Sequence, residues 1–117
     1  MPRIWLPSDM KFFAVLGLVL SLGACQAGSS PEDAHALVQK GAVLLDVRSP
    51  DEFAAGHLEG AINVPVDRLE SSLKEVGAPD RPVVVYCHSG RRSRWASEIL
   101  QKNGFKKVHD LGPMSRW

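Results

Sequence analysis

The sequence predicts an α/β fold, with a small, mostly parallel sheet flanked by helices. Short apolar runs rich in β-branched residues alternate along the chain with stretches of helical spacing. Glycine or proline separates most of these runs from the next. The run at 83–86 is continuously apolar, which is typical of a parallel strand covered on both faces. These features imply crossover connections, with helices on both sides of the sheet.

The predicted domain begins with a helix followed by a strand. Ser30 precedes Pro31, so we expect Ser30 to be the N-cap and proline to take the first helical position. One apolar stripe follows along this helix: Ala34, Leu37 and Val38. Gly41 ends the helix, and the apolar run at 43–47 is predicted to be a buried strand.

The middle of the chain predicts two helices and one short strand. A helical stretch at 51–55 leads to a strand at 61–64, which Pro65 stops. A single helix follows, because apolar residues recur at i, i+4 and i+7: Leu69, Leu73 and Val76. Turn residues at 77–82 then break the pattern.

The last third of the chain carries the most informative residue. The strand at 83–86 has Cys87 at its carboxyl end, and polar residues at 88–92 lead into a helix at 93–103. Four residues of this helix are expected to be buried: Trp95, Ala96, Ile99 and Leu100. A last strand at 107–111 completes the alternation. Ligands of such sheets bind beyond the carboxyl ends of the strands, so Cys87 is suitably positioned for chemistry.

The N-terminal segment has the pattern of a secretory signal. Lys11 precedes an apolar run at 12–22, which is shorter than the roughly 20 residues needed to span a bilayer. Residues 22–25, Leu-Gly-Ala-Cys, resemble the bacterial lipobox, whose cysteine receives a lipid. We therefore predict a lipoprotein signal peptide at 1–24, with 1–9 as an over-extended start.

Cleavage after this signal would make Cys25 the lipidated first residue of the mature protein. Residues 25–30 would then tether a single domain at 31–117, a size typical of one small core. We expect the protein in the bacterial cell envelope, lipid-anchored to the membrane and facing the periplasm or the exterior. Removal of the signal leaves equal numbers of basic and acidic side chains, so no nucleic-acid partner is expected.

Cys87 would be the free cysteine of a chain that is lipidated at Cys25. With Cys25 lipidated, the mature chain has no partner for an intrachain disulfide. A strand end, a polar loop and a helix N-terminus surround Cys87 with backbone N–H groups, which favour an anion. Arg91 and Arg92 add positive charge, which favours the thiolate. The histidines lack the spacing of metal ligands, so no metal is expected.

The run at 87–93, Cys-His-Ser-Gly-Arg-Arg-Ser, closely resembles the active-site loop of rhodanese-like sulfurtransferases. Further segments resemble the family's signatures in the right order and spacing: 45–48, 52–53, 56–65, and 110–112 with Trp117. The resemblance covers about residues 32–117 and implies a rhodanese-like fold. Pro113 stands where the family usually has a second glycine, and we expect it to lie outside the loop.

The resemblance implies a two-step sulfur transfer that needs no cofactor. Cys87, the catalytic residue, would take the outer sulfur from a small donor such as thiosulfate and pass it to a thiol or cyanide-like acceptor. The rest of the loop would bind the substrate: His88, Ser89, Gly90, Arg91, Arg92 and Ser93. Arg91 or Arg92 would orient the anionic donor, whereas His88 is either a hydrogen-bond donor or a solvent-exposed spectator. We expect a monomer.

Four residues of the first family signature carry charge: Asp46, Arg48, Glu52 and His57. We interpret them as framework residues. Asp46 and Arg48 are close enough in sequence to a helix start and to Glu52 to serve as caps and ion pairs rather than to take a direct part in the reaction.

Other functions fit parts of this sequence. A cysteine phosphatase of this fold needs arginine six positions after its cysteine, where this chain has Ser93. A non-catalytic binding module of the family usually lacks the cysteine, which is present here as Cys87. A thiol–disulfide oxidoreductase ordinarily has Cys-x-x-Cys, although Cys87 could act as a one-cysteine exchange partner. Sulfur transfer is therefore the predicted activity.

Overall fold

The computed structural model describes residues 30–117. The predicted signal peptide and the lipidated Cys25 lie outside these residues. The elements follow one another in this order: α1 (Pro31–Gln39), β1 (Val43–Asp46), α2 (Pro50–Ala55), β2 (Ile62–Asn63), α3 (Val66–Leu69), α4 (Leu73–Val76), β3 (Val83–Cys87), α5 (Arg91–Lys102), β4 (Val108–Pro113) and the 3₁₀ helix η1 (Met114–Arg116). Within 30–117, no helix is long and apolar enough to cross a membrane.

The four strands form one parallel sheet in the order β2-β1-β3-β4. β3 lies between β1 and β4 and is buried along its whole length, which explains its continuous apolar sequence. Asp46 at the end of β1 pairs with Tyr86, and Cys87 at the end of β3 pairs with Pro113. The carboxyl ends of these strands therefore meet at one edge of the sheet, where Cys87 lies.

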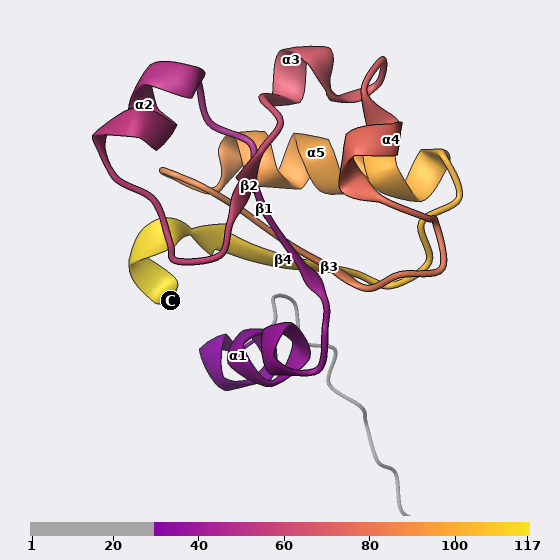
Figure 1. Ribbon diagram of the computed structural model, residues 1–117, viewed down its shortest axis with the longest axis horizontal. Coiled ribbons are helices and arrows are strands. Elements are labelled where there is room, and N and C mark those ends of the chain that lie inside the picture. The colour runs from indigo at the N-terminus through magenta and orange to yellow at the C-terminus, as the bar shows by residue number, and fades with distance from the viewer. Residues whose placement is uncertain (1–29) are drawn as a thin grey trace, which may run out of the picture.

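Helices cover both faces of the sheet, which confirms the predicted α/β class (Figure 1). Over one face, α3, α4 and α5 pack on side chains that include Val43, Leu45, Val83, Val85 and Cys87. Over the other, α1 and η1 pack on Leu44, Val84, Tyr86 and Leu111. Successive side chains of a strand point to opposite faces. Cys87 therefore belongs to the α5 side of the sheet, and its neighbour Tyr86 to the α1 side.

Side-chain caps fix the starts of two helices. Ser30 Oγ accepts a hydrogen bond from the N–H of Asp33 at 3.2 Å, which confirms the predicted N-cap of α1. At α2, Ser49 Oγ accepts from the N–H of Glu52, while Glu52 Oε1 accepts from the N–H of Ser49. These two bonds form a capping box, so α2 begins at Pro50, one residue earlier than predicted.

The region after β2 contains two short helices instead of the single helix predicted there. The chain turns at Ser71 and Ser72, whose N–H groups bond to carbonyls three residues back. The turn ends α3 at Leu69 and lets α4 start at Leu73. Leu69 and Val76 are nevertheless buried against the sheet, so the apolar spacing predicted the buried face correctly but not the break.

Trp95 is 51% exposed, so its predicted burial is wrong. The buried positions of α5 are Ser93, Ala96, Ser97, Ile99 and Leu100. Successive helical residues lie about 100° apart around the axis, so Trp95, two positions after Ser93, points away from the sheet. The start of α5 at Arg91 also precedes the predicted start by two residues.

Candidate active site

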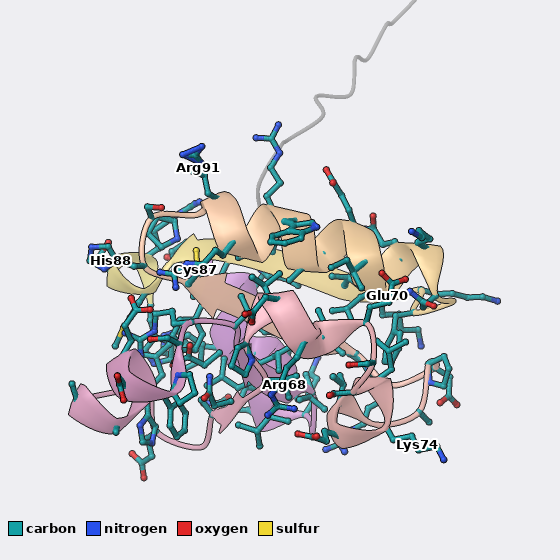
Figure 2. The ribbon with its side chains drawn as sticks, turned by 90° about the horizontal axis from the view of Figure 1, so that it is seen from above. Arg68, Glu70, Lys74, Cys87, His88 and Arg91 are labelled. Atoms are coloured by element: carbon teal, nitrogen blue, oxygen red, sulfur yellow. The ribbon has the colours of Figure 1, made fainter. Side chains whose placement is uncertain are left out.

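Cys87 ends β3 at the carboxyl edge of the sheet, and its side chain is fully buried. The loop 88–90 connects it to α5, and the backbone N–H of Gly90 donates a hydrogen bond to Cys87 Sγ at 2.9 Å. Figure 2 shows Cys87 beside the first turn of α5, with His88 on the loop and Arg91 at the start of the helix. The sulfur thus faces a helix N-terminus, where N–H groups and the helix dipole favour negative charge.

The loop is held in place by the first turn of α5. Gly90 has a φ of 100°, a left-handed conformation that glycine adopts without steric cost. Its carbonyl accepts hydrogen bonds from Ser93 Oγ at 3.1 Å and from the N–H of Arg94 at 3.2 Å. Ser93 is fully buried, so its hydroxyl is committed to the shape of the loop.

Pro113 is the last residue of β4 and lies outside the loop 88–90, as predicted, but directly beside it. It pairs with Cys87 in the ladder between β3 and β4. A Cβ atom added to Gly90 would lie 3.5 Å from Pro113 Cδ. The parallel pairing brings the two strand ends to the same edge although they are far apart in sequence. The proline ring therefore forms a wall of the loop.

Arg92 forms a bidentate ion pair with Glu52 of α2. Its Nη1 lies 2.7 Å from Glu52 Oε1, and its Nη2 lies 3.0 Å from Oε2. The same carboxylate caps α2, so Arg92 joins the first turn of α5 to the start of α2. An ion pair was expected between Glu52 and its neighbours in sequence. The observed partner, Arg92, lies 40 residues away, and the family signature that contains Glu52 does not identify it.

This pair shifts the pKa values of both groups. Hydrogen bonds from Arg92, and then from the N–H of Ser49, lower the pKa of Glu52 to about 2. Hydrogen bonding to Glu52 raises the pKa of Arg92, and the Coulomb interaction with Cys87 contributes in the same direction. The guanidinium group therefore lies within electrostatic reach of the sulfur. It retains further N–H groups that can bind an anion.

His88, Ser89 and Arg91 lie on the outer side of the loop and are exposed. Figure 2 shows Arg91 extending outward from the start of α5. Among the described residues, neither Arg91 nor His88 has an ion pair or a side-chain hydrogen bond. The residues predicted to bind substrate thus divide into two sets. These three face solvent, whereas Gly90, Arg92 and Ser93 are held by other parts of the fold.

A buried ion pair supports the strand ends beneath the loop. Arg48 donates to the carboxylate of Asp46 at distances between 2.7 and 3.1 Å. Its guanidinium carbon lies 5.7 Å from the ring centre of Tyr86, whose hydroxyl accepts a hydrogen bond from the N–H of Leu58. Burial, followed by hydrogen bonding with Asp46, raises the pKa of Tyr86. Because Tyr86 precedes Cys87, this network fixes the backbone that carries the sulfur.

His57 makes its contacts with α2. Its Nδ1 lies 2.8 Å from the carbonyl oxygen of Phe53, and the two rings stack with their centroids 3.7 Å apart. The four charged residues of the first signature thus make caps, ion pairs and packing contacts, which agrees with their interpretation as framework.

The family model of the rhodanese-like domain matches residues 30–117, which is the whole described part of the chain. The chain belongs to this family. Its rhodanese-like domain is 35% identical to the thiosulfate sulfurtransferase GlpE of Stutzerimonas stutzeri over 88 residues, which cover 74% of this chain and 80% of that relative. It is 43% identical over 81 residues to a putative mitochondrial thiosulfate sulfurtransferase of Schizosaccharomyces pombe.

Some relatives are longer than the matched region. The S. pombe alignment covers 59% of this chain and 57% of the relative. The uncharacterized protein YqhL of Bacillus subtilis is 40% identical over 77 residues, which cover 65% of this chain and 60% of that protein. The rhodanese-like domain thus spans less than two thirds of these two proteins.

Solved structures show the same fold. The human single-domain sulfurtransferase TSTD1 has a TM-score of 0.66 at 27% identity, covering 77% of this chain and 90% of TSTD1. A rhodanese with anions from E. coli has a TM-score of 0.62 at 32% identity, covering 66% and 92% of the two chains. The predicted rhodanese-like fold is therefore confirmed.

Proposed function

We propose that this rhodanese-like domain transfers sulfane sulfur from a donor such as thiosulfate to a thiophilic acceptor, through a persulfide on Cys87. The observation that carries the proposal is the hydrogen bond from the N–H of Gly90 to Cys87 Sγ at the N-terminus of α5. An anionic sulfur is stabilised at such a position. Relatives named thiosulfate sulfurtransferase support the same activity.

The first half-reaction loads the cysteine. The Cys87 thiolate attacks the outer sulfur of thiosulfate, a new S–S bond forms, and the bond to the sulfonate sulfur breaks. Sulfite leaves with the electron pair of that bond, so no external oxidant is needed. Arg92, whose position Glu52 fixes, would offer its remaining N–H groups to the anionic donor.

The second half-reaction unloads the cysteine. A thiolate or cyanide acceptor attacks the outer sulfur of the persulfide, and the S–S bond breaks with its electron pair going to Cys87. The thiolate is thereby regenerated. The loop N–H groups would stabilise negative charge on the thiolate and on the persulfide alike, which suits an intermediate that must form and decay.

The position of Ser93 argues against phosphatase activity. A phosphatase loop would need an arginine there to hold phosphate. Ser93 is buried, and its hydroxyl donates to the carbonyl of Gly90, so it holds the loop together instead. The presence of Cys87 at the centre of an intact loop likewise favours catalysis over binding alone.

Mass spectrometry of the full chain after thiosulfate treatment tests the proposal. We expect Cys87 to gain one sulfur atom with release of sulfite, and Cys87→Ser to do neither. The same preparation should leave p-nitrophenyl phosphate intact. Cys87-dependent hydrolysis of that ester, with no sulfur gained from thiosulfate, would favour the phosphatase alternative.

We further propose that Cys25 anchors the protein by a lipid in the bacterial cell envelope, where the domain faces the periplasm or the exterior. The support is the lipobox at 22–25. Cys25→Ala should abolish labelling by a palmitate analogue and move the protein out of the membrane fraction, or leave an uncleaved precursor. Equal labelling of wild type and variant would overturn the anchor.

A further inference from the structure

The exposed ring of Trp95 needs an explanation beyond packing. Among residues 30–117, the exposed large hydrophobic side chains are Trp95, at 51%, and Ile62, at 38%. The five buried residues of α5 pack it against the sheet without the indole ring. Trp95 lies one turn after Arg91, close to the loop that carries Cys87. Tryptophan in such a setting is typical of the centre of a binding surface.

Two hollows adjoin this ring, and both include residues of the first turn of α5, which directly follows the loop 88–90. The first, of about 400 Å³, is lined by Arg91, Arg92, Arg94, Trp95 and Glu98. The second, of about 280 Å³, is lined by Val47, Ser49, Pro65, Val66, Asp67, Arg92 and Trp95. Trp95 and Arg92 belong to both hollows. We call the residues around the two hollows the Trp95 surface.

The positive charge of the Trp95 surface is concentrated in its first hollow, whereas the second hollow adds one acidic residue, Asp67. The first hollow has three arginines against one acidic residue, Glu98, whereas the mature chain has equal numbers of basic and acidic side chains. Glu52 neutralises Arg92. Arg91 and Arg94 have no ion pair among the described residues. An indole ring between arginines matches a partner that combines an apolar side chain with acidic residues.

We propose that the Trp95 surface docks an acidic segment of a protein that accepts sulfur from Cys87, an inference that rests on the proposed sulfur transfer. Because Arg91 and Arg92 belong to this surface and directly follow the loop, a docked partner would have its thiol close to the persulfide. The acceptor thiolate would attack the outer sulfur, the S–S bond to Cys87 would break, and the partner would leave as a persulfide. Cys87 would return to the thiolate.

The sheet topology favours a protein over the membrane as the occupant. Ser30 and α1 lie on the face of the sheet opposite α5 (Figure 1). An anchor at Cys25 would attach the domain on the α1 side. The Trp95 surface lies on the opposite face of the sheet from this attachment, where a soluble partner can reach it.

Sulfur transfer to two matched peptides tests the inference. The full chain is first loaded with thiosulfate. One acceptor peptide carries a single cysteine beside leucine and among aspartates and glutamates, and the matched peptide has lysine at every acidic position. Dithiothreitol serves as the reference acceptor without a docking element.

We expect the kcat/KM for the acidic peptide to exceed that for the basic peptide at least about tenfold at low ionic strength. Trp95→Ala should lower the acidic-peptide value about tenfold, and Arg94→Glu should lower it about fivefold or more. Sulfite release and transfer to dithiothreitol should stay within about twofold in both variants. Lys106→Glu, the same charge reversal beyond the far end of α5, should change none of these rates.

The possible failures are distinguishable. If the two peptides react equally, or neither variant changes their ratio while sulfite release is normal, the docking surface is wrong and the sulfurtransferase proposal stands. If wild type releases no sulfite and gains no sulfur, the proposed function fails and the acceptor role fails with it. Quenching of Trp95 fluorescence by brominated phosphatidylglycerol vesicles, lost in Trp95→Ala, would assign the surface to the membrane instead.

Discussion

The domain has two acid–arginine pairs near the carboxyl edge of its sheet, and they differ in burial and reach. Asp46 and Arg48 are almost completely buried, with side-chain exposures of 0% and 7%, and lie two residues apart. Glu52 and Arg92 are 36% and 35% exposed and connect two helices. The first pair is enclosed by the fold. The second remains in contact with solvent beside Cys87.

Because the two ion pairs differ in burial, they have different roles in the domain. A buried charge that loses its partner has no water to replace it, so the Asp46–Arg48 pair is needed for stability. Solvent compensates most of the loss of an exposed pair, so Glu52 contributes little to stability. Glu52 instead holds the Arg92 guanidinium group in a defined position near Cys87. Removing one partner of each pair should separate these roles.

The largest effect is expected from Asp46→Asn. The change leaves the buried Arg48 without a counter-charge and should lower the free energy of unfolding by about 3–5 kcal/mol. Glu52→Gln is the matched substitution in the exposed pair and should cost less than about 1 kcal/mol. Urea denaturation of both variants measures the difference. Equal losses would mean that burial does not distinguish the two pairs.

A smaller effect, on catalysis, should distinguish the paired arginine from its exposed neighbour. Arg92→Ala should lower kcat/KM for thiosulfate about ten- to hundredfold, because it removes a charge-assisted hydrogen bond to the donor. Arg91→Ala should lower it only about twofold at low salt and leave it unchanged at high salt, because an exposed charge acts through screened attraction.

Alkylation of Cys87 by iodoacetamide, an uncharged reagent, is the control for these kinetics. Its rate should change far less than thiosulfate use in both variants. Equal slowing of alkylation and thiosulfate turnover in Arg92→Ala would show that this arginine activates the thiol. A larger loss of kcat/KM for thiosulfate in Arg91→Ala than in Arg92→Ala would mean that Arg91, and not Arg92, binds the donor.

The smallest expected effect is the pH dependence of the contribution that the Glu52–Arg92 pair makes to the free energy of unfolding. The pKa of Glu52 falls from an ordinary value of 4.5 to about 2 on folding, so its contribution to stability is fully present above pH 4.5. That contribution is lost as the pH falls from 4.5 through about 2. The stability difference between wild type and Glu52→Gln should therefore shrink over this range. A difference that grows on acidification would contradict the assignment.

The sequence is most informative where the chemistry is local. The position of Cys87 at the end of a strand, the Ser30 cap and the alternation of strands and helices depend on neighbouring residues, and the structure confirms all three. The break between α3 and α4 is a turn within a continuous apolar spacing, and periodicity alone does not reveal it. The exposure of Trp95 depends on which side of α5 packs on the sheet.

The parts of the site that sequence reasoning misses arise from tertiary pairing. Pro113 reaches the loop because β4 pairs with β3 in parallel, and no pattern near either residue indicates this contact. Glu52 meets Arg92 because α2 and α5 both start at the carboxyl edge of the sheet. The family signature contains both residues, but it gives no information about which charges face one another.

The burial of Cys87 has a consequence for how the sulfur is exposed over a reaction cycle. In the unloaded thiol the side chain is fully covered, which shields it from bulky oxidants. A bound sulfane sulfur extends the side chain by about 2 Å, the length of an S–S bond. The transferable atom would then lie nearer the mouth of the loop than Sγ does. The cysteine would thus be less exposed when empty than when it carries the sulfane sulfur.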